Sequence, residues 1–200
     1  GVTGISTQQL KAAVPGEVRE LCQRLKDAGH RAWLVGGCVR DELLREGSTE
    51  QPEERGDWDI ATSALPEQVT KLFRKVIPTG IQHGTVTVLA PHGQYEVTTL
   101  RGETTYTDGR RPDAVYFVDD IKDDLARRDF TINAIAYDVL EDRLIDPFDG
   151  AVDLSRRLLR AVGVASERFA EDGLRVLRGA RFAATLELEI EESTASAIEP

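Results

Sequence analysis

A pair of glycines between a short apolar stretch and a helical pattern constrains the folding of this chain more than any other feature. Residues 32–35 read Ala-Trp-Leu-Val, Gly36 and Gly37 follow at once, and residues 39–45 carry the first turns of a helix. This order predicts a strand that turns directly into a helix, because glycine adopts the backbone conformations that such a turn needs. The turn leaves backbone N–H groups unpaired at the helix N-terminus, where phosphate binds favourably, and Arg40 can add a charge-assisted contact.

The remaining pattern indicates short strands mixed with helices. We expect strands over 57–61, 85–90, 95–100 and within 140–147, with 85–90 and 95–100 forming a hairpin. We expect helices over 15–28, from 63–67 to about residue 75 with Thr62 or Ser63 near the cap, from 125 to 133, and over the Arg-rich segment 166–184. These elements predict an α+β fold with a mixed or antiparallel sheet and helices on one side.

Three carboxylates are candidates for chemistry. Asp57 and Asp59 lie two apart on a predicted strand, so both project from one face, where a divalent cation would relieve their repulsion. A solvated strand end is the more common explanation of such a pair taken by itself. Glu96, on a neighbouring strand, could complete a two-metal site, and a surface glutamate explains it almost as well. Together with the Gly-Gly turn, the pair predicts a triphosphate cradle facing metal ions, as nucleotidyl transfer requires.

Two residues of the Arg-rich segment could select a base. Asp172 and Arg175 lie three apart on the predicted helix, and Glu171 with Arg175 forms an i,i+4 pair, for which a surface salt bridge is the ordinary explanation. An ionised Asp only accepts hydrogen bonds and Arg only donates them, so the pair matches an exocyclic amine beside a ring-nitrogen acceptor. C and A present that edge, whereas U and G do not.

Composition excludes several other classes. The net charge is -10, which argues against a chain that holds nucleic acid mainly through a basic surface. No apolar run is long enough to span a membrane, which predicts a cytosolic protein without a membrane partner. Cys22 and Cys38 are too few for a disulfide framework or a zinc site and are expected to be buried thiols, and the three histidines lack metal-ligand spacing. The glycine-rich Rossmann and P-loop motifs are missing.

The order of these motifs carries a family resemblance. The most informative stretches are LVGGCVRD (34–41), DWDIATSALP (57–66), DLARRDFTINAIAYD (124–138) and FAEDGLRVLRGARFAA (169–184). With them the chain resembles the class II CCA-adding tRNA nucleotidyltransferases and the related bacterial poly(A) polymerases, within the polymerase-β-like superfamily. The resemblance implies a nucleotidyltransferase palm, or head domain, over residues 1–150 and the beginning of a helical neck over 151–200.

The resemblance also implies roles for particular residues. Asp57 and Asp59 would hold Mg²⁺, and Glu96 is similar in place to an acidic residue on the adjoining strand. The implied substrates are CTP, ATP and the tRNA 3′ end. The residues implied in nucleotide binding are Gly36, Gly37, Arg40, Asp41, Arg127, Arg128, Asp129, Asn133, Glu171, Asp172, Arg175 and Arg178. Residues 102–113 resemble a flexible loop involved in switching from C to A addition.

Some features depart from the family or leave alternatives open. The spacing between Asp41 and Asp57 is longer than is typical, apparently through an insertion that lengthens a loop. The sequence contains no Met and ends at Pro200, which suggests a fragment without the family's body and tail domains. Poly(A) synthesis, addition of C alone or of A alone, and a catalytically inactive RNA-binding homologue remain alternatives, and the oligomeric state is open.

Overall fold

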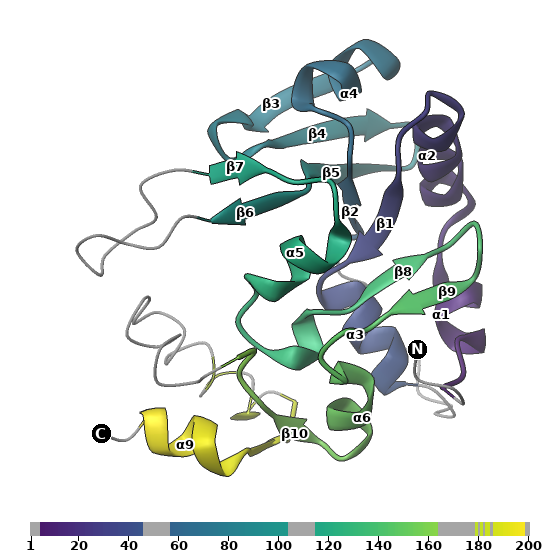
Figure 1. Cartoon of the computed structure of the whole chain (residues 1–200). Coiled ribbons are helices and arrows are strands. Elements are labelled where there is room, and N and C mark those ends of the chain that lie inside the picture. The colour runs from purple at the N-terminus through teal and green to yellow at the C-terminus, as the bar shows by residue number, and fades with distance from the viewer. Residues whose placement is uncertain are drawn as a thin grey trace.

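The central feature of the fold is a mixed sheet, which forms one layer of the molecule (Figure 1). The computed structural model describes residues 5–45, 57–103, 115–163, 179, 181, 183–184 and 186–198. Within them, seven strands follow the order β3-β4-β5-β2-β1-β8-β9. The strands are β1 (Ala32–Val35), β2 (Asp59–Thr62), β3 (Val76–Gly80), β4 (Thr85–Ala90), β5 (Gly93–Thr99), β8 (Ala136–Asp138) and β9 (Arg143–Ile145).

The sheet is mixed because β2 runs parallel to β5 and antiparallel to β1, while the β4–β5 and β8–β9 pairs are antiparallel. A separate ribbon of β6 (Arg101–Glu103) and β7 (Val115–Phe117) projects beside it (Figure 1). The helices are α1 (Gln8–Ala13), α2 (Gly16–Asp27), α3 (Gly37–Leu44), α4 (Pro66–Leu72), α5 (Ile121–Ala126), α6 (Gly150–Ser155) and α9 (Glu192–Ile198), with 3₁₀ turns η1 (Ile81–His83) and η2 (Thr131–Asn133). The predicted α+β class and mixed sheet are confirmed.

Both faces of the sheet are covered by helices, so the expectation of helices on one side was wrong. Leu34 of β1 and Ile60 of β2 belong to a core cluster that includes residues of α1, α2, α3 and α4. Their neighbours Trp33 and Ala61 point to the opposite face and share a second cluster with Leu125 of α5. The alternation of side chains along β1 and β2 therefore feeds two cores.

The local sequence pattern accounts for α2 fully and for the start of α4 only in part. Apolar residues spaced for one helical face are buried in α2, and Gly29 follows with φ 89°, which confirms the predicted helix and its end. The start of α4 differs from expectation, because Thr62 and Ser63 bond to Arg31 instead of capping the helix. Leu65 occupies the cap position, and its N–H donates to the Gln68 side chain over 2.8 Å.

The predicted helix over 125–133 was wrong. Helix α5 begins earlier, because the Asp120 carboxylate accepts a hydrogen bond from the Lys122 N–H and caps it. It ends at Ala126, since Phe130 is extended and bridges to Ala161, and only a 3₁₀ turn follows. Strands β3 and β8 were not predicted, and α4 ends at Leu72 rather than near residue 75.

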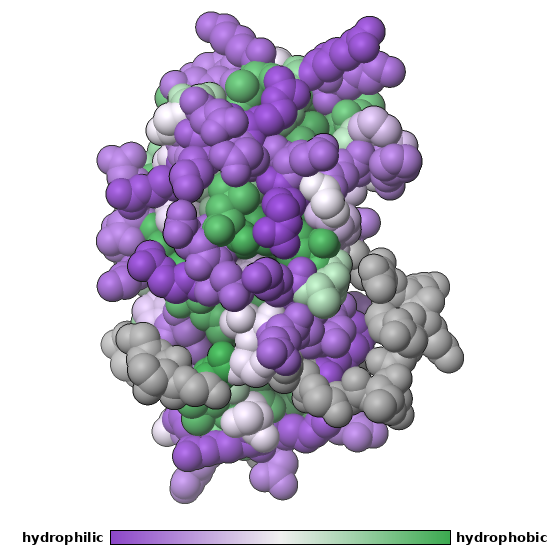
Figure 2. Space-filling model, turned by 90° about the vertical axis from the view of Figure 1, so that its right-hand side faces the viewer, coloured by the Kyte–Doolittle hydropathy of each residue, from purple (hydrophilic) through white to green (hydrophobic). Residues whose placement is uncertain are grey.

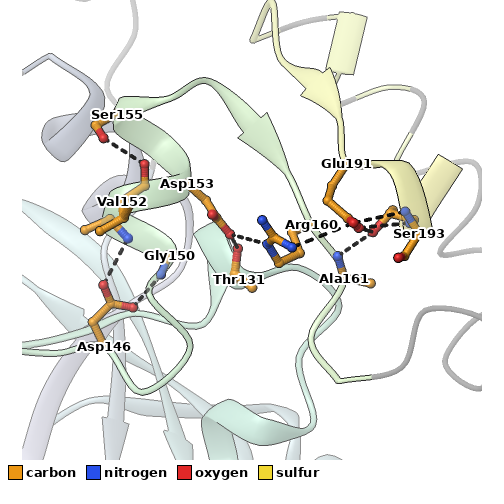
Figure 3. Close-up of polar contacts among 12 residues, drawn as sticks. Thr131, Asp146, Gly150, Val152, Asp153, Ser155, Arg160, Ala161, Glu191 and Ser193 are labelled. Carbon is orange, nitrogen blue, oxygen red and sulfur yellow. Dashed lines mark hydrogen bonds and ion pairs between the residues drawn. The ribbon is translucent and has the colours of Figure 1, made fainter.

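The C-terminal elements form a small unit against the sheet domain. Strand β10 (Leu158–Leu159) pairs in parallel with β11 (Glu189–Ile190), and α9 lies beside them (Figure 1). A polar network connects this unit inward, with Thr131 and Arg160 on the Asp153 carboxylate and Arg160 also reaching Glu191 (Figure 3). The division into a head over 1–150 and a neck over 151–200 remains a prediction.

The outer surface is largely polar where it can be seen. The face that carries α1, α2 and the β8–β9 hairpin is mainly hydrophilic, with small apolar areas among polar side chains (Figure 2). No helix in the described part of the chain has the length and apolar character needed to cross a membrane.

Candidate active site

The predicted Gly-Gly turn lies directly over the predicted carboxylates. Gly36 has φ 83°, and a Cβ atom placed on it would be 3.0 Å from Oδ2 of Asp59. Both the conformation and the close approach require glycine. Helix α3 begins at Gly37, so its N-terminal N–H groups lie beside Asp59, as the turn pattern predicted.

The carboxylates come together at the N-terminal end of β2. Asp59 and Glu96 are register partners on the parallel strands β2 and β5, so their side chains lie next to each other on one face. Asp57 lies just before β2 rather than within it, which corrects the predicted strand boundary. All three line one cavity of about 410 Å³, together with Gly37, Cys38, Arg40 and Asp41.

The electrostatics of this cavity favour a cation. Burial, and then the charge of Glu96, raises the pKa of Asp59 to about 6, while the Arg128 charge lowers it and Asp57 raises it further. The Asp59 carboxylate accepts no hydrogen bond from the described residues, so its charge is poorly compensated within that part of the chain.

The donor set suits a hard divalent ion. Oxygen ligands are what Mg²⁺ prefers, and it is commonly held by one or two carboxylates together with substrate phosphates. No group of three or more His, Cys, Asp or Glu side chains among the described residues is arranged to hold a metal ion by itself. A hard ion held by the carboxylates of this cavity would take the rest of its ligands from other oxygen donors.

A second network joins two of the predicted nucleotide-binding motifs. Arg40 donates to Asp41 over 3.0 Å and to Oδ1 of Asn133 over 2.8 Å. Asn133 in turn donates to Asp129 over 3.2 Å, and the same Asp129 oxygen accepts the Phe130 N–H over 2.7 Å. Residues 93 positions apart are thus joined in one polar network, which reaches the cavity through Arg40 and Asp41 and which the sequence motifs alone did not place together.

Two predicted arginines, Arg127 and Arg128, form ion pairs with a carboxylate that the sequence analysis did not identify. Arg127 and Arg128 approach the buried Asp124 at 3.7 Å and 3.2 Å. The spacing of three and four residues on a helical turn was the available signal, since such residues are neighbours on a helix surface. The predicted helix began at residue 125, so Asp124 lay outside it and its spacing to the arginines was not interpreted as a helical contact.

Other predicted residues lie outside the described part of the chain. These are Glu171, Asp172, Arg175 and Arg178. The predicted loop over 102–113 begins within β6, and its residues 104–113 also lie outside.

Fold and site together define a palm domain of the polymerase-β type, with a helix N-terminus facing carboxylates on the central strands. The chain belongs to the family of the poly A polymerase head domain, whose model matches residues 32–160. Nucleotidyltransferases of this family generally use divalent metal ions.

Known relatives agree with this assignment. A CCA-adding enzyme of Lactobacillus delbrueckii is 53% identical over 176 residues, which cover 88% of this chain and 42% of the relative. The crystal structure of the Bacillus stearothermophilus CCA-adding enzyme with CTP matches with a TM-score of 0.78 at 41% identity, over 96% of this chain and 42% of that one. A tRNA nucleotidyltransferase bound to a primer tRNA and an ATP analog matches with a TM-score of 0.67 at 32% identity, covering 89% and 48% of the two chains. The chain thus spans less than half the length of these relatives.

Proposed function

We propose that this chain is the catalytic head of an enzyme that adds C and A nucleotides to the 3′ end of tRNA, with CTP and ATP as substrates. The observation that carries the proposal is the meeting of Asp59, Glu96 and the Gly36–Gly37 turn at one cavity. The names of the relatives, and the CTP and primer tRNA bound in similar structures, support it. The proposed substrates make the cytosol the expected location.

Each wall of the cavity has a proposed role. Asp57 and Asp59 would hold Mg²⁺, which when bound stabilises negative charge on the attacking hydroxyl and on the pyrophosphate leaving group. Glu96 lies where it can support the same site. The N–H groups of Gly36 and Gly37 and the Arg40 guanidinium would bind the triphosphate.

The polar network of Arg40, Asp129 and Asn133, together with Arg127 and Arg128, would hold the sugar and the phosphates. Asp129 and Asn133 offer an acceptor and a donor suited to ribose hydroxyls, and Arg127 and Arg128 carry charge toward the triphosphate. For base selection we propose Asp172 with Arg175, and Glu171 and Arg178 as their helical neighbours, from hydrogen-bond polarity and the resemblance. Asp172→Ala is expected to reduce the preference for CTP over UTP more than it reduces total turnover.

A second candidate function is poly(A) synthesis, the repeated addition of A to an RNA 3′ end. The description of the matching family, a poly A polymerase head domain, favours it. Both functions use the same metal and triphosphate site, so only the choice of nucleotide separates them.

The test is incorporation by the natural full-length protein. It is incubated with Mg²⁺ and tRNA that lacks its 3′ CCA, and with each labelled triphosphate in turn. We expect C to be added first and A only after C, and addition of a run of A with ATP alone would favour the second candidate. Asp57→Asn should lose about 100-fold or more in turnover, as removal of charge-stabilising groups does. Asp27→Asn, at an exposed site on α2, is the control and should keep wild-type turnover.

Glu96→Gln decides the role of the third carboxylate. A loss comparable to that of Asp57→Asn would make Glu96 part of the metal site, and a loss of less than about tenfold would leave it a neighbouring charge. Absence of any nucleotide incorporation by the wild-type protein would refute the proposed function.

A further inference from the structure

The arginines Arg127 and Arg128 are held by a single carboxylate that lies deeper than either of them. Asp124 is 1% exposed, and its Oδ1 accepts a hydrogen bond from Arg128 Nη2 over 3.2 Å. Its Oδ2 lies 3.7 Å from Arg127 Nη2. One buried carboxylate thus faces two adjacent cations, and this geometry orients both guanidinium groups.

The same carboxylate is fixed to the sheet domain. Asp124 Oδ2 accepts the Arg101 N–H over 2.9 Å, immediately after Leu100, which is fully buried. The Arg101 carbonyl accepts a hydrogen bond from Arg127 Nε over 3.1 Å. The Arg101 N–H and the Arg101 carbonyl therefore both take part in one cluster with Asp124 and Arg127, which joins α5 to the start of β6.

Arg128 has a further nitrogen beyond the one that Asp124 holds. Its Nε–H is buried and has no acceptor within the described residues. Arg128 is thus fixed by Asp124 through Nη2, while Nε keeps its donor without a protein acceptor in that part of the chain.

We propose that Asp124 is a positioning residue for triphosphate binding, which holds Arg127 and Arg128 in the orientation that receives the phosphates. The inference rests on the proposed function, and it extends it to a residue that does not itself touch the nucleotide. An arginine whose side chain is fixed in advance loses less conformational entropy when it binds a phosphate. Loss of the Asp124 charge should therefore weaken binding through the phosphates rather than through the base.

The experiment measures equilibrium binding of CTP and of CMP in the presence of Mg²⁺, with the natural full-length protein and its Asp124→Asn variant. We expect CTP affinity to fall by about tenfold or more and CMP affinity by less than about threefold, because arginine contacts to phosphate are lost. In the incorporation assay the KM for CTP and ATP should rise together, more than kcat falls. A general loosening of the fold would weaken CMP and CTP alike.

Asp153→Asn is the matched control. Asp153 is also a buried aspartate, 4% exposed, with an ion pair to Arg160 and a hydrogen bond from Thr131, but it lies toward the C-terminal unit (Figure 3). Both variants should lower the melting temperature, since each removes a buried carboxylate that is paired with arginine and hydrogen-bonded. Only Asp124→Asn should change the ratio of CTP to CMP affinity.

A double variant tests whether Asp124 acts through Arg128. In an Arg128→Ala background, Asp124→Asn no longer leaves the Arg128 charge without its carboxylate. The further loss of CTP affinity caused by Asp124→Asn should therefore be clearly smaller in this background than in the wild type. Equal losses in both backgrounds, or an unchanged CTP-to-CMP ratio in Asp124→Asn, would overturn the inference and leave the proposed function standing. Absence of any triphosphate binding by the wild type would instead refute the proposed function.

Discussion

Replacement of Asp59 by Asn should stabilise the protein while it abolishes activity. Burial and the neighbouring Glu96 raise the pKa of Asp59 from 3.8 to about 6. At about 1.4 kcal/mol per pKa unit, this difference corresponds to a cost of roughly 3 kcal/mol for the ionised carboxylate in the folded protein near neutral pH. Asn keeps the shape of the side chain without its charge. Because the amide must still be accommodated in a partly buried position, we expect a net gain of about 1 to 3 kcal/mol.

The sign of the pH dependence follows from the direction of the shift. A carboxyl whose pKa is higher in the folded than in the unfolded state destabilises the folded protein once the pH exceeds the unfolded value. The cost grows from about pH 4 and is complete above about pH 6. The stability gain of Asp59→Asn at pH 5 should therefore be roughly half of the gain at pH 7.5.

Urea unfolding in the presence of EDTA, at pH 7.5 and at pH 5, measures both quantities. The exposed Asp27→Asn variant is the control and should match the wild type at both pH values. With Mg²⁺ and CTP added, the wild type should gain stability and Asp59→Asn should gain much less, since a bound ligand stabilises only the form that binds it. An Asp59→Asn variant no more stable than wild type at pH 7.5, or equally stabilised at both pH values, would refute the electrostatic reasoning.

Three further predictions concern the turn, the packing of α6 and the thiols. Gly36→Ala should reduce turnover by about tenfold or more, measured by incorporation, because its φ of 83° strains an alanine and the new Cβ meets Asp59 at 3.0 Å. Gly150→Ala should lower stability by about 3 kcal/mol or more in urea unfolding, because its Cβ would lie 2.0 Å from the Thr131 carbonyl oxygen; a loss below about 1 kcal/mol would contradict that packing. Burial raises the pKa of both cysteine thiols to about 12, so the native protein should react with a thiolate-specific reagent at pH 8 far more slowly than the unfolded protein does.

The parts of the site that sequence could predict depend on neighbouring residues. The strand–Gly-Gly–helix order is local, and the structure confirms it at Gly36. The alternation of side chains along β5 is also local, and it puts Glu96 on the face opposite to the buried Tyr95 and Val97. The sequence alone allows several registers between β2 and β5, and only the register of the folded chain sets Glu96 beside Asp59.

The parts that sequence missed depend on contacts between distant segments. Helix α5 begins after Asp120, which caps it, and ends before Phe130, which pairs with Ala161. No local sequence pattern predicts the pairing of Phe130 with Ala161. The predicted helix boundary therefore placed Asp124 outside the helix, and its contacts with the two arginines could not be predicted. Strand β3 was missed for a related reason, since Pro78 weakens its strand pattern and is tolerated only because β3 is the edge of the sheet.

The division of charge across the cavity identifies the kind of ligand better than any single residue does. Asp57, Asp59 and Glu96 bring negative charge to the cavity, whereas Arg40, which is paired with Asp41, and the N-terminus of α3 bring positive charge. A free anion would be repelled by the three carboxylates. A divalent cation bound to a triphosphate would suit both kinds of group, because the carboxylates favour the ion while Arg40 and the helix N-terminus favour the phosphates. Binding of CTP and of the metal ion should therefore be mutually dependent, each weakening by at least about tenfold when the other is withheld.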